Sequence, residues 1–404
     1  MNHLAPLSEL PDMHPAPGVT SDDSEIMVPP GLILTTATDG RGILRYVSPQ
    51  LCAISGLSAP QLLGTQHRSL GHSDTPRGVY HLYWQRLCDG YPACAYVKYK
   101  AANSRFYWAF TAAMATDDGF MSWRLRPETV HLAMIRDLYR DMCDRESQGL
   151  SSQQSADHFV NCLAKAGFAD YDSFMHQALA AECEKRSHAG QTPNSDVGHL
   201  SELIDLLNTA ERLSEQVSRD FNKVRSEPVN MRIMAGRIEG ASGALGTISQ
   251  NYDIMASEMQ QLVERLRDPQ KGTLGRMRKA VQHGRFQSQI IELLAEYSDQ
   301  TEQNACAIQA DMIERLRKST QDYTSEAKLA SRWIPDICRQ LRHRINGLNV
   351  VKLLCRVESG RIQNADGGLE GIIERLETFH QTTEINLAML SAKADQIRTT
   401  SAAL

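Results

Sequence analysis

The hydrophobic pattern of this 404-residue chain changes at Pro127, and this change limits the folds that the chain can adopt. In residues 32–126, short runs rich in β-branched and aromatic residues are separated by turn-forming dipeptides, which is typical of strands. After Pro127 the apolar residues recur at spacings of three and four to the end of the chain, which is typical of amphipathic helices. The pattern therefore predicts a small α+β domain followed by a long all-α region.

The α+β domain is expected to contain five strands. Two strands come first and are joined by a hairpin at Asp39-Gly40, because Asp-Gly supplies the positive φ of a tight turn. Short helices opened by Ser48 and Ser58 follow, then a longer helix, and then three more strands. The strands are predicted at residues 32–39, 43–48, 93–102, 105–115 and 120–126, and the longer helix at residues 77–88. An antiparallel sheet with helices on one face leaves a cavity between the layers, where a small ligand can be held.

The rest of the chain divides into a tail, a linker and a bundle. Residues 1–30 are rich in Pro, Ser and Asp without an apolar period, so they are predicted to be disordered. The sheet domain then spans residues 31–128, and residues 129–195 form a helical linker. Residues 196–404 carry long helical periods, which favour an antiparallel helical bundle or coiled coil.

An internal repeat suggests that the bundle has two related halves, at about residues 196–270 and 315–398. The first half contains five polar residues whose spacing recurs in the second: Arg225, Asn230, Arg237, Glu239 and Glu258 correspond to Arg344, Asn349, Arg356, Glu358 and Glu377. A true duplication and the ordinary monotony of helical sequence explain this recurrence equally well.

Composition excludes several classes of protein. The 43 basic and 48 acidic residues give a net charge of -5, which does not favour a nucleic-acid or membrane-surface binder. The nine cysteines show no Cys-x-x-Cys pair and no zinc-site spacing, so they suit buried thiols in a reducing cytosol. No apolar run is long enough to span a bilayer, and the N-terminus does not resemble a signal peptide. A cytoplasmic protein is expected.

Several motifs in the sheet domain resemble the PAS domain of aerotaxis receptors. They are Ser55-Gly56, Leu62-Leu63-Gly64, the run His72-Ser73-Asp74-Thr75-Pro76, Trp84 in the following helix, Gly90-Tyr91-Pro92 and Tyr107-Trp108. Domains of that family bind FAD and pass its redox state to a signalling module. The resemblance therefore implies an α+β PAS fold and a sensor function.

The resemblance also assigns cofactor-binding residues. His72, Asp74 and Trp84 match the family motif, whereas Ser48 stands where the family has Asn. The family's Arg before the histidine is replaced by Gly71, so FAD remains one alternative among three. Haem is the second, with His81 as the iron ligand, because haem-binding PAS proteins ligate iron from this helix. A PAS domain without a cofactor is the third, and no metal ligands are predicted.

The C-terminal half resembles, more distantly, the signalling hairpin of chemoreceptors, the methyl-accepting chemotaxis proteins. Residues 230–243 and 349–361 are each similar to the hairpin tip, so one chain could form by itself the four-helix bundle that receptors build by dimerising. The tip residues implied are Asn230, Arg237, Glu239, Asn349, Arg356 and Glu358. Partners in a chemotaxis-type array or other signalling proteins are implied, and a homodimer through the PAS domain or the helices stays open. The alternative is a plain helical bundle.

No catalytic constellation was found. The sequence contains no phosphate-binding Gly-x4-Gly-Lys motif, no His-Glu-x2-His and no Gly-x-Ser-x-Gly. His343 lies in a helical stretch but no nucleotide-binding domain follows it, as a histidine kinase would require. We therefore expect a non-enzymatic, cytoplasmic PAS sensor of the aerotaxis type. The alternatives are a cofactor-free oligomerisation or scaffold protein and a haem-based gas sensor.

Overall fold

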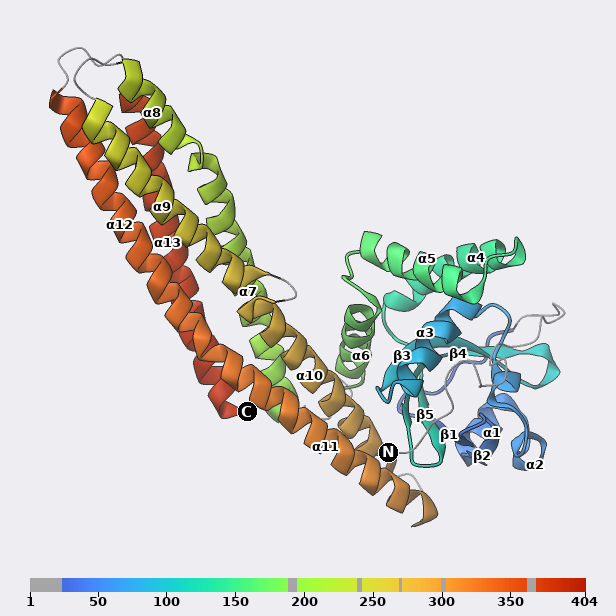
Figure 1. Ribbon diagram of the computed structural model, residues 1–404. Helices are drawn as coiled ribbons and strands as arrows, with labels where there is room; N and C mark the ends of the chain where they lie inside the picture. The colour runs from blue at the N-terminus through green and yellow to red at the C-terminus, as the bar shows by residue number, and fades with distance from the viewer. Residues whose placement is uncertain (1–23, 188–194, 238–241, 269–270, 299–302, 362–367) are drawn as a thin grey trace. The chain divides into compact units, whose positions relative to one another are not determined.

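The computed structural model describes residues 24–187, 195–237, 242–268, 271–298, 303–361 and 368–404 (Figure 1). The chain forms two compact units. The first comprises Met1–Pro193 and Phe286–Arg317, and the second comprises Asn194–Arg285 and Lys318–Leu404. Helices α10 (Thr273–Ser298) and α11 (Gln303–Ser331) each contribute residues to both units.

The first unit is built around a five-stranded antiparallel sheet, as predicted. The strands lie in the order β2-β1-β5-β4-β3. Their bounds are β1 Leu34–Asp39, β2 Leu44–Val47, β3 Ala93–Lys100, β4 Phe106–Ala115 and β5 Gly119–Leu125. At the expected hairpin, one carboxylate oxygen of Asp39 accepts hydrogen bonds from the backbone amides of Arg41 and Ile43, both at 3.0 Å. The positive φ expected at Asp39-Gly40 lies instead at Gly42, where φ is 75°.

Short helices cover one face of the sheet, which we call the inner face. They are α1 (Pro49–Ser55), α2 (Ala59–Leu62), the 3₁₀ helix His67–Leu70 and the longer α3 (Arg77–Cys88). A second 3₁₀ turn, Ala102–Ser104, joins β3 to β4. Trp84 of α3 packs edge-on against Phe120 of β5, with ring centroids 5.1 Å apart. The element order agrees with the prediction of two strands, short helices, one longer helix and three strands.

The opposite, outer face is also covered, by helices that the sequence suggested as a linker. They are α4 (His131–Ser147) and α6 (Tyr171–Ser187), while α5 (Ser152–Lys165), which lies between them in the sequence, packs on α3. The Tyr139 hydroxyl of α4 donates to the Tyr96 carbonyl of β3 at 2.9 Å, and the Tyr171 hydroxyl of α6 donates to the Cys94 carbonyl at 2.7 Å. The described part of residues 129–195 thus belongs largely to the sheet unit.

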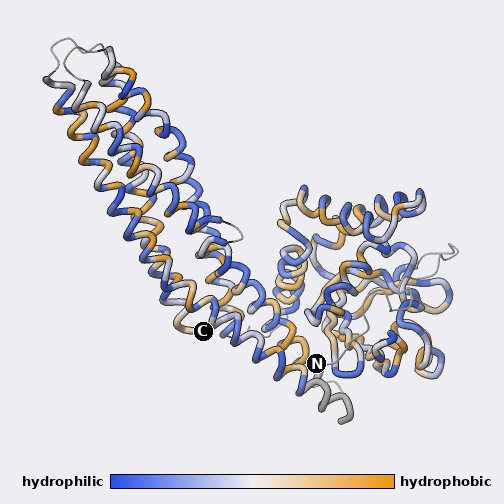
Figure 2. Tube along the Cα trace, viewed as in Figure 1, coloured by the Kyte–Doolittle hydropathy of each residue, from blue (hydrophilic) through white to orange (hydrophobic). Residues whose placement is uncertain are grey.

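The second unit is a helical bundle. Helices α7 (Ser195–Val224), α9 (Ser242–Arg267), α12 (Trp333–Arg361) and α13 (Gly368–Ala403) pack against one another, and α8 (Glu227–Arg237) packs on α9. Figure 2 shows hydrophobic and hydrophilic residues alternating along these helices. Their apolar sides form one core that includes Leu203, Leu207, Leu341, Leu348 and Leu387. The all-α region predicted after the sheet domain is confirmed.

Across the described ranges, none of the helices combines the length and apolar character that crossing a bilayer requires.

Candidate functional site

A fully buried arginine lies at the centre of the inner face. Arg124 of β5 is paired in register with Leu34 of β1 and with Thr111 of β4, so it occupies the middle of the sheet. Its side chain is completely shielded from solvent. Within the described residues no carboxylate forms an ion pair with it. A buried cation without a counter-charge is costly, so its surroundings must supply compensating hydrogen bonds.

Neutral groups supply those bonds. Two guanidinium nitrogens of Arg124 each donate to the Thr36 hydroxyl at 3.1 Å, and one of them also lies 2.9 Å from Nε2 of His67. The guanidinium carbon lies 4.6 Å from the ring centroid of Tyr99, which adds a cation–π contact. Thr36 is held in turn by the Ser122 hydroxyl at 2.9 Å. The site therefore keeps its positive charge inside the domain.

Arg124 also determines the protonation state of His67. Arginine has only N–H donors, so Nε2 of His67 must be the acceptor and the imidazole must be neutral. Burial, reinforced by the positive charge of Arg124, lowers the pKa of His67 to about 3. His67 packs edge-on against Trp84, with ring centroids 5.9 Å apart. The pair is therefore a buried cation held by a neutral histidine.

Tyrosines surround this pair. Tyr99 and Tyr107 stack at 5.3 Å between ring centroids, and the Tyr99 hydroxyl bonds the Thr111 hydroxyl at 2.9 Å. Burial raises the pKa of Tyr107, although the charge of Arg124 opposes the rise. Within the described residues, the Tyr107 hydroxyl and Nε of Arg124 are buried without a hydrogen-bond partner. The Tyr107 hydroxyl and Nε of Arg124 are therefore hydrogen-bond donors that an anionic or electron-rich group could bind.

The structure separates the residues assigned from the PAS resemblance. His72 and Asp74 lie beside Lys98 and Phe106, whose side chains belong to the outer face. The Lys98 ammonium contacts Asp74 at 2.7 Å and lies 3.8 Å from the Phe106 ring centroid. Asp74, Lys98 and Phe106 border a pocket of about 380 Å³, which Tyr139 of α4 also lines, whereas His72 does not line it. Trp84 is instead on the inner face.

Ser48 and His81 have other surroundings. The Ser48 hydroxyl caps α1, where it accepts from the amide of Leu51 at 3.2 Å and from that of Thr35 at 3.0 Å. His81 is half-buried on α3. The predicted cofactor residues thus do not converge on one cavity in the described structure, and they do not fit a single flavin or haem site.

The described tip residues lie on α8 and α12. The Asn230 amide donates to the Glu227 carboxylate at 3.2 Å, and that carboxylate also pairs with Arg375 at 2.8 Å. Arg356 lies 3.7 Å from Glu377.

Other tip positions are less informative. Asn349 is exposed, Glu358 is half-buried, and Arg237 is the last residue of α8. Glu239 lies outside the described residues. Two repeat positions do meet, since Arg344 contacts Glu258 at 3.0 Å.

Sequence reasoning missed Arg124 and His67. The available signal was a single arginine in the run of residues 120–125, which otherwise contains only apolar residues and Ser122. A charged residue is rarely buried without a partner, which is why such a residue is normally assigned to the surface. In the described residues, no group of three His, Cys, Asp or Glu side chains could hold a metal ion.

Comparison with known proteins shows similarity over a small part of the chain. No protein-family model matches the chain. A nitrogen fixation regulatory protein of Klebsiella pneumoniae is 36% identical over 66 residues, which are 16% of this chain and 13% of that relative. A protein of the same name from Klebsiella oxytoca matches over the same length with the same identity. The chain therefore matches only a small part of these curated relatives.

Proposed function

We propose that this chain is a regulatory PAS-type protein without catalytic activity, in which the sheet domain receives a signal and the helical bundle passes it on. The motifs between Ser55 and Trp108 support the PAS assignment. The name of the Klebsiella relatives, nitrogen fixation regulatory protein, supports a regulatory role. The aerotaxis branch is the finer form of this proposal and rests on the run from His72 to Pro76.

One observation carries the proposal: two helices are shared by the two units. Phe286 and Ile290 of α10 and Met312 of α11 belong to the apolar core of the sheet unit. The Phe286 ring lies 4.6 Å from that of His176 on α6, and Arg315 of α11 pairs with Asp117 beside β5. The remaining residues of the same helices belong to the bundle unit. A change in side-chain packing around the sheet can therefore alter the packing of the bundle. This requires that a signal ligand binds the two packing states with different affinities.

Arg124 is the group through which the sheet core would respond. A bound anion, or an electron-rich ring, would compensate its buried charge and so stabilise one packing over another. The proposal includes no step through FAD or haem, because the residues assigned to those cofactors lie on both faces of the sheet.

Replacing Arg124 with Met is expected to alter hydrogen exchange in both units. The substitution removes the buried charge but keeps an unbranched side chain, so the sheet core repacks around it. We expect faster exchange in β1 and β5, and also in α10, α11 and α13, measured on the full chain by mass spectrometry. Tryptophan emission verifies that Trp84 stays buried in the variant.

Phe286→Ala provides the matched control for this relay. In the Arg124→Met background, Phe286→Ala should leave the faster hydrogen exchange of β5 unchanged. It should reduce the increase in hydrogen exchange of α13, because it removes a contact between α10 and α6. If α13 exchanges identically in the wild type and in Arg124→Met, the relay is refuted.

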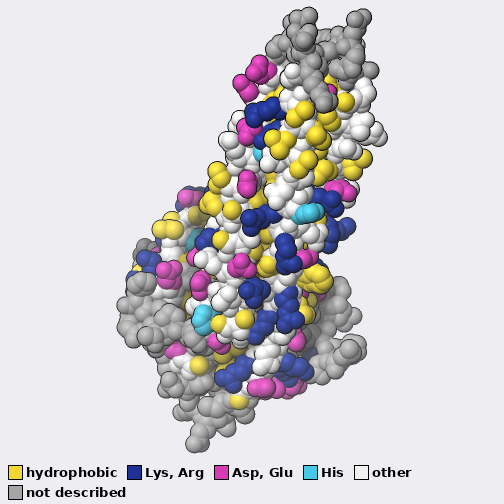
Figure 3. All heavy atoms as spheres, turned by 90° about the vertical axis from the view of Figure 1, so that its left-hand side faces the viewer, with side chains coloured by type: hydrophobic (Ala, Val, Ile, Leu, Met, Phe, Trp, Pro, Cys, Tyr) yellow, Lys and Arg dark blue, Asp and Glu magenta, His cyan; other side chains and the backbone are white. Residues whose placement is uncertain are grey.

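An apolar stripe on α12 supports the protein-partner part of the proposal. Val350, Leu353, Leu354 and Val357 are 47% to 56% exposed and recur at helical spacing. On the same helix, Leu348 and Cys355 are buried in the bundle core. Figure 3 shows hydrophobic side chains gathered on this face near one end of the bundle, with basic side chains further along. An exposed apolar stripe of this kind marks an interaction surface.

A second copy of the chain is the partner that the proposal assigns to this stripe. A two-fold axis places the same stripe of two molecules face to face, which is the commonest arrangement of a homodimer. This contact also favours the alternative of an oligomerisation or scaffold protein, and the hydrogen-exchange experiment distinguishes that alternative from a relay.

The double substitution Leu353→Asp with Val357→Lys is expected to convert a dimer into a monomer, because two charges would be buried in the contact. Sedimentation velocity over a range of protein concentrations measures this. Ile385→Asp on α13 is the matched control, since Ile385 is 62% exposed but lies outside the stripe. A monomeric wild type, or a double variant that dimerises like the wild type, would contradict the assignment.

A further inference from the structure

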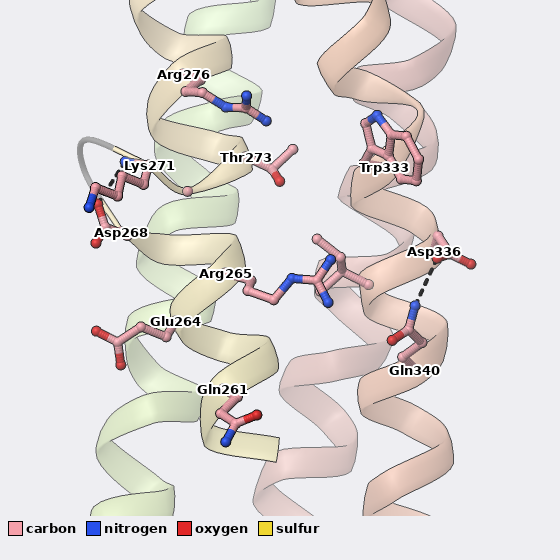
Figure 4. A pocket seen from close by; sticks show the side chains of 12 residues that line it. Gln261, Glu264, Arg265, Asp268, Lys271, Thr273, Arg276, Trp333, Asp336 and Gln340 are labelled. Atoms are coloured by element: carbon pink, nitrogen blue, oxygen red, sulfur yellow. Dashed lines mark hydrogen bonds between the residues drawn. The ribbon is translucent and has the colours of Figure 1, made fainter. Parts of the chain in front are cut away.

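A second pocket lies within the bundle unit, where α9 ends, α10 begins and α12 begins. It has a volume of about 740 Å³, within the usual range of small-molecule sites. Figure 4 shows Arg265, Thr273 and Arg276 on one wall and Trp333 and Gln340 on the other. Nothing in the proposed relay uses this pocket.

The pocket contains two arginines that have no ion-pair partner. Arg265 of α9 and Arg276 of α10 both line it, and no carboxylate of the described residues pairs with either. Figure 4 shows both side chains extending toward the space between α9, α10 and α12. Two guanidinium groups on one wall favour an anion with several oxygens, because each can bind two of them.

The start of α10 adds further donors. α10 begins at Thr273, and the first amides of a helix have no acceptor within the helix itself. Thr273 is only 6% exposed and lines the pocket, and its hydroxyl has no hydrogen-bond partner among the described residues. Figure 4 shows it on the pocket side of α10. A hydroxyl at a helix N-terminus is a typical ligand of phosphate oxygens.

Three acidic residues, Glu264, Asp268 and Asp336, also line the pocket, and among the described residues none of them pairs with Arg265 or Arg276. One Asp336 oxygen accepts from the Gln340 amide at 2.8 Å, and an Asp268 oxygen accepts from the amide of Lys271 at 2.7 Å. Glu264 points away from α12 in Figure 4. The two arginine side chains that extend into the space therefore have no carboxylate partner among the described residues.

The opposite wall carries an exposed aromatic ring. Trp333 is 62% exposed, whereas Trp84, Trp108 and Trp123 are all buried in the sheet unit. An indole exposed to this extent beside a cationic wall can stack on a planar ring. Trp333 would therefore stack on the ring of a ligand, and Arg265 and Arg276 on the opposite wall would bind the anionic group of the same ligand.

We infer that this pocket binds a small ligand that carries a phosphate group and a planar ring, of the nucleotide class. The phosphate lies against Arg265, Arg276 and the N-terminus of α10, and the ring stacks on Trp333. This inference is independent of the sheet domain and of any ligand at Arg124.

Fluorescence of the full chain provides the test, with ADP as the probe. Trp333 is the exposed tryptophan, so a ring stacked on it should quench the red-edge emission saturably, and Trp333→Phe should abolish that signal. Pyrophosphate, which has no ring, should compete with ADP without quenching. Adenosine, which has no phosphate, should bind at least about tenfold more weakly than ADP.

Charge variants then test the anion wall. Arg265→Gln and Arg276→Gln should each weaken ADP binding about tenfold, measured by calorimetry. Arg267→Gln is the matched control, because Arg267 is also an exposed arginine near the end of α9 but does not line the pocket. The inference is overturned if ADP and pyrophosphate show no saturable binding at about 1 mM. It is also overturned if the pocket variants bind ADP like Arg267→Gln.

Discussion

Between pH 6.5 and about pH 5, the sheet unit is expected to lose about 2 kcal/mol of its free energy of unfolding through His67. The folded-state pKa of His67 is about 3, whereas an unfolded histidine titrates near 6.5. In this window the unfolded chain binds a proton that the folded chain excludes, so stability falls as the pH falls, by about 1.4 kcal/mol per pH unit. The loss continues until the pH reaches the folded pKa.

His67→Gln isolates this effect. Glutamine offers a carbonyl oxygen to the Arg124 guanidinium in place of Nε2 but has no proton to gain, so the variant should lack this part of the pH dependence. Urea unfolding of the full chain, followed by emission of the buried tryptophans, measures the difference between the two proteins at each pH. Burial also lowers the pKa of His131. This histidine contributes equally to the pH dependence of both proteins, so its effect cancels in the difference between them. Parallel stability curves for the wild type and the variant would refute the neutral, buried state of His67.

Replacing Gly78 with Ala is expected to destabilise the sheet unit by about 3 kcal/mol. Gly78 lies in the first turn of α3, where α3 crosses α5. A Cβ atom at this position would be 2.5 Å from the backbone nitrogen of Ala156 and 2.5 Å from the carbonyl carbon of Ser155. Because these are backbone atoms, the helices must move apart, and the core between them loses contacts. Urea unfolding measures the cost.

Gly198→Ala is the matched control for this crossing. Gly198 lies near the start of α7, and a Cβ there would meet nothing within 4 Å. Alanine in an open helical position should raise stability by up to about 1 kcal/mol, because it lowers the entropy of the unfolded chain. Equal effects of the two substitutions would mean that α5 does not pack closely on α3.

Much of the secondary structure could be predicted because its signals are local. The helix predicted at residues 77–88 matches α3 as observed, and the Asp39-Gly40 hairpin joins β1 to β2. In both cases the determining residues are close together in sequence, since a cap, a turn dipeptide or an apolar period acts within a few residues.

The candidate site was harder to predict because it depends on partners that are distant in sequence. Arg124 bonds Thr36 across a separation of 88 residues and His67 across 57. The motif residues His72 and Trp84 are close in sequence, yet the sheet lies between their side chains. A motif fixes spacing along the chain, but the pleat of a strand decides which face each residue occupies.

The sequence by itself determined the break at Pro127, the number of strands and the helical character of the remainder, because each follows from local periodicity. Only the tertiary structure decided that α4, α5 and α6 pack within the sheet unit, that α10 and α11 are shared by both units, and that Arg124 is buried. These features depend on register and on packing between distant segments. Their free energies arise from contacts that no short stretch of sequence contains.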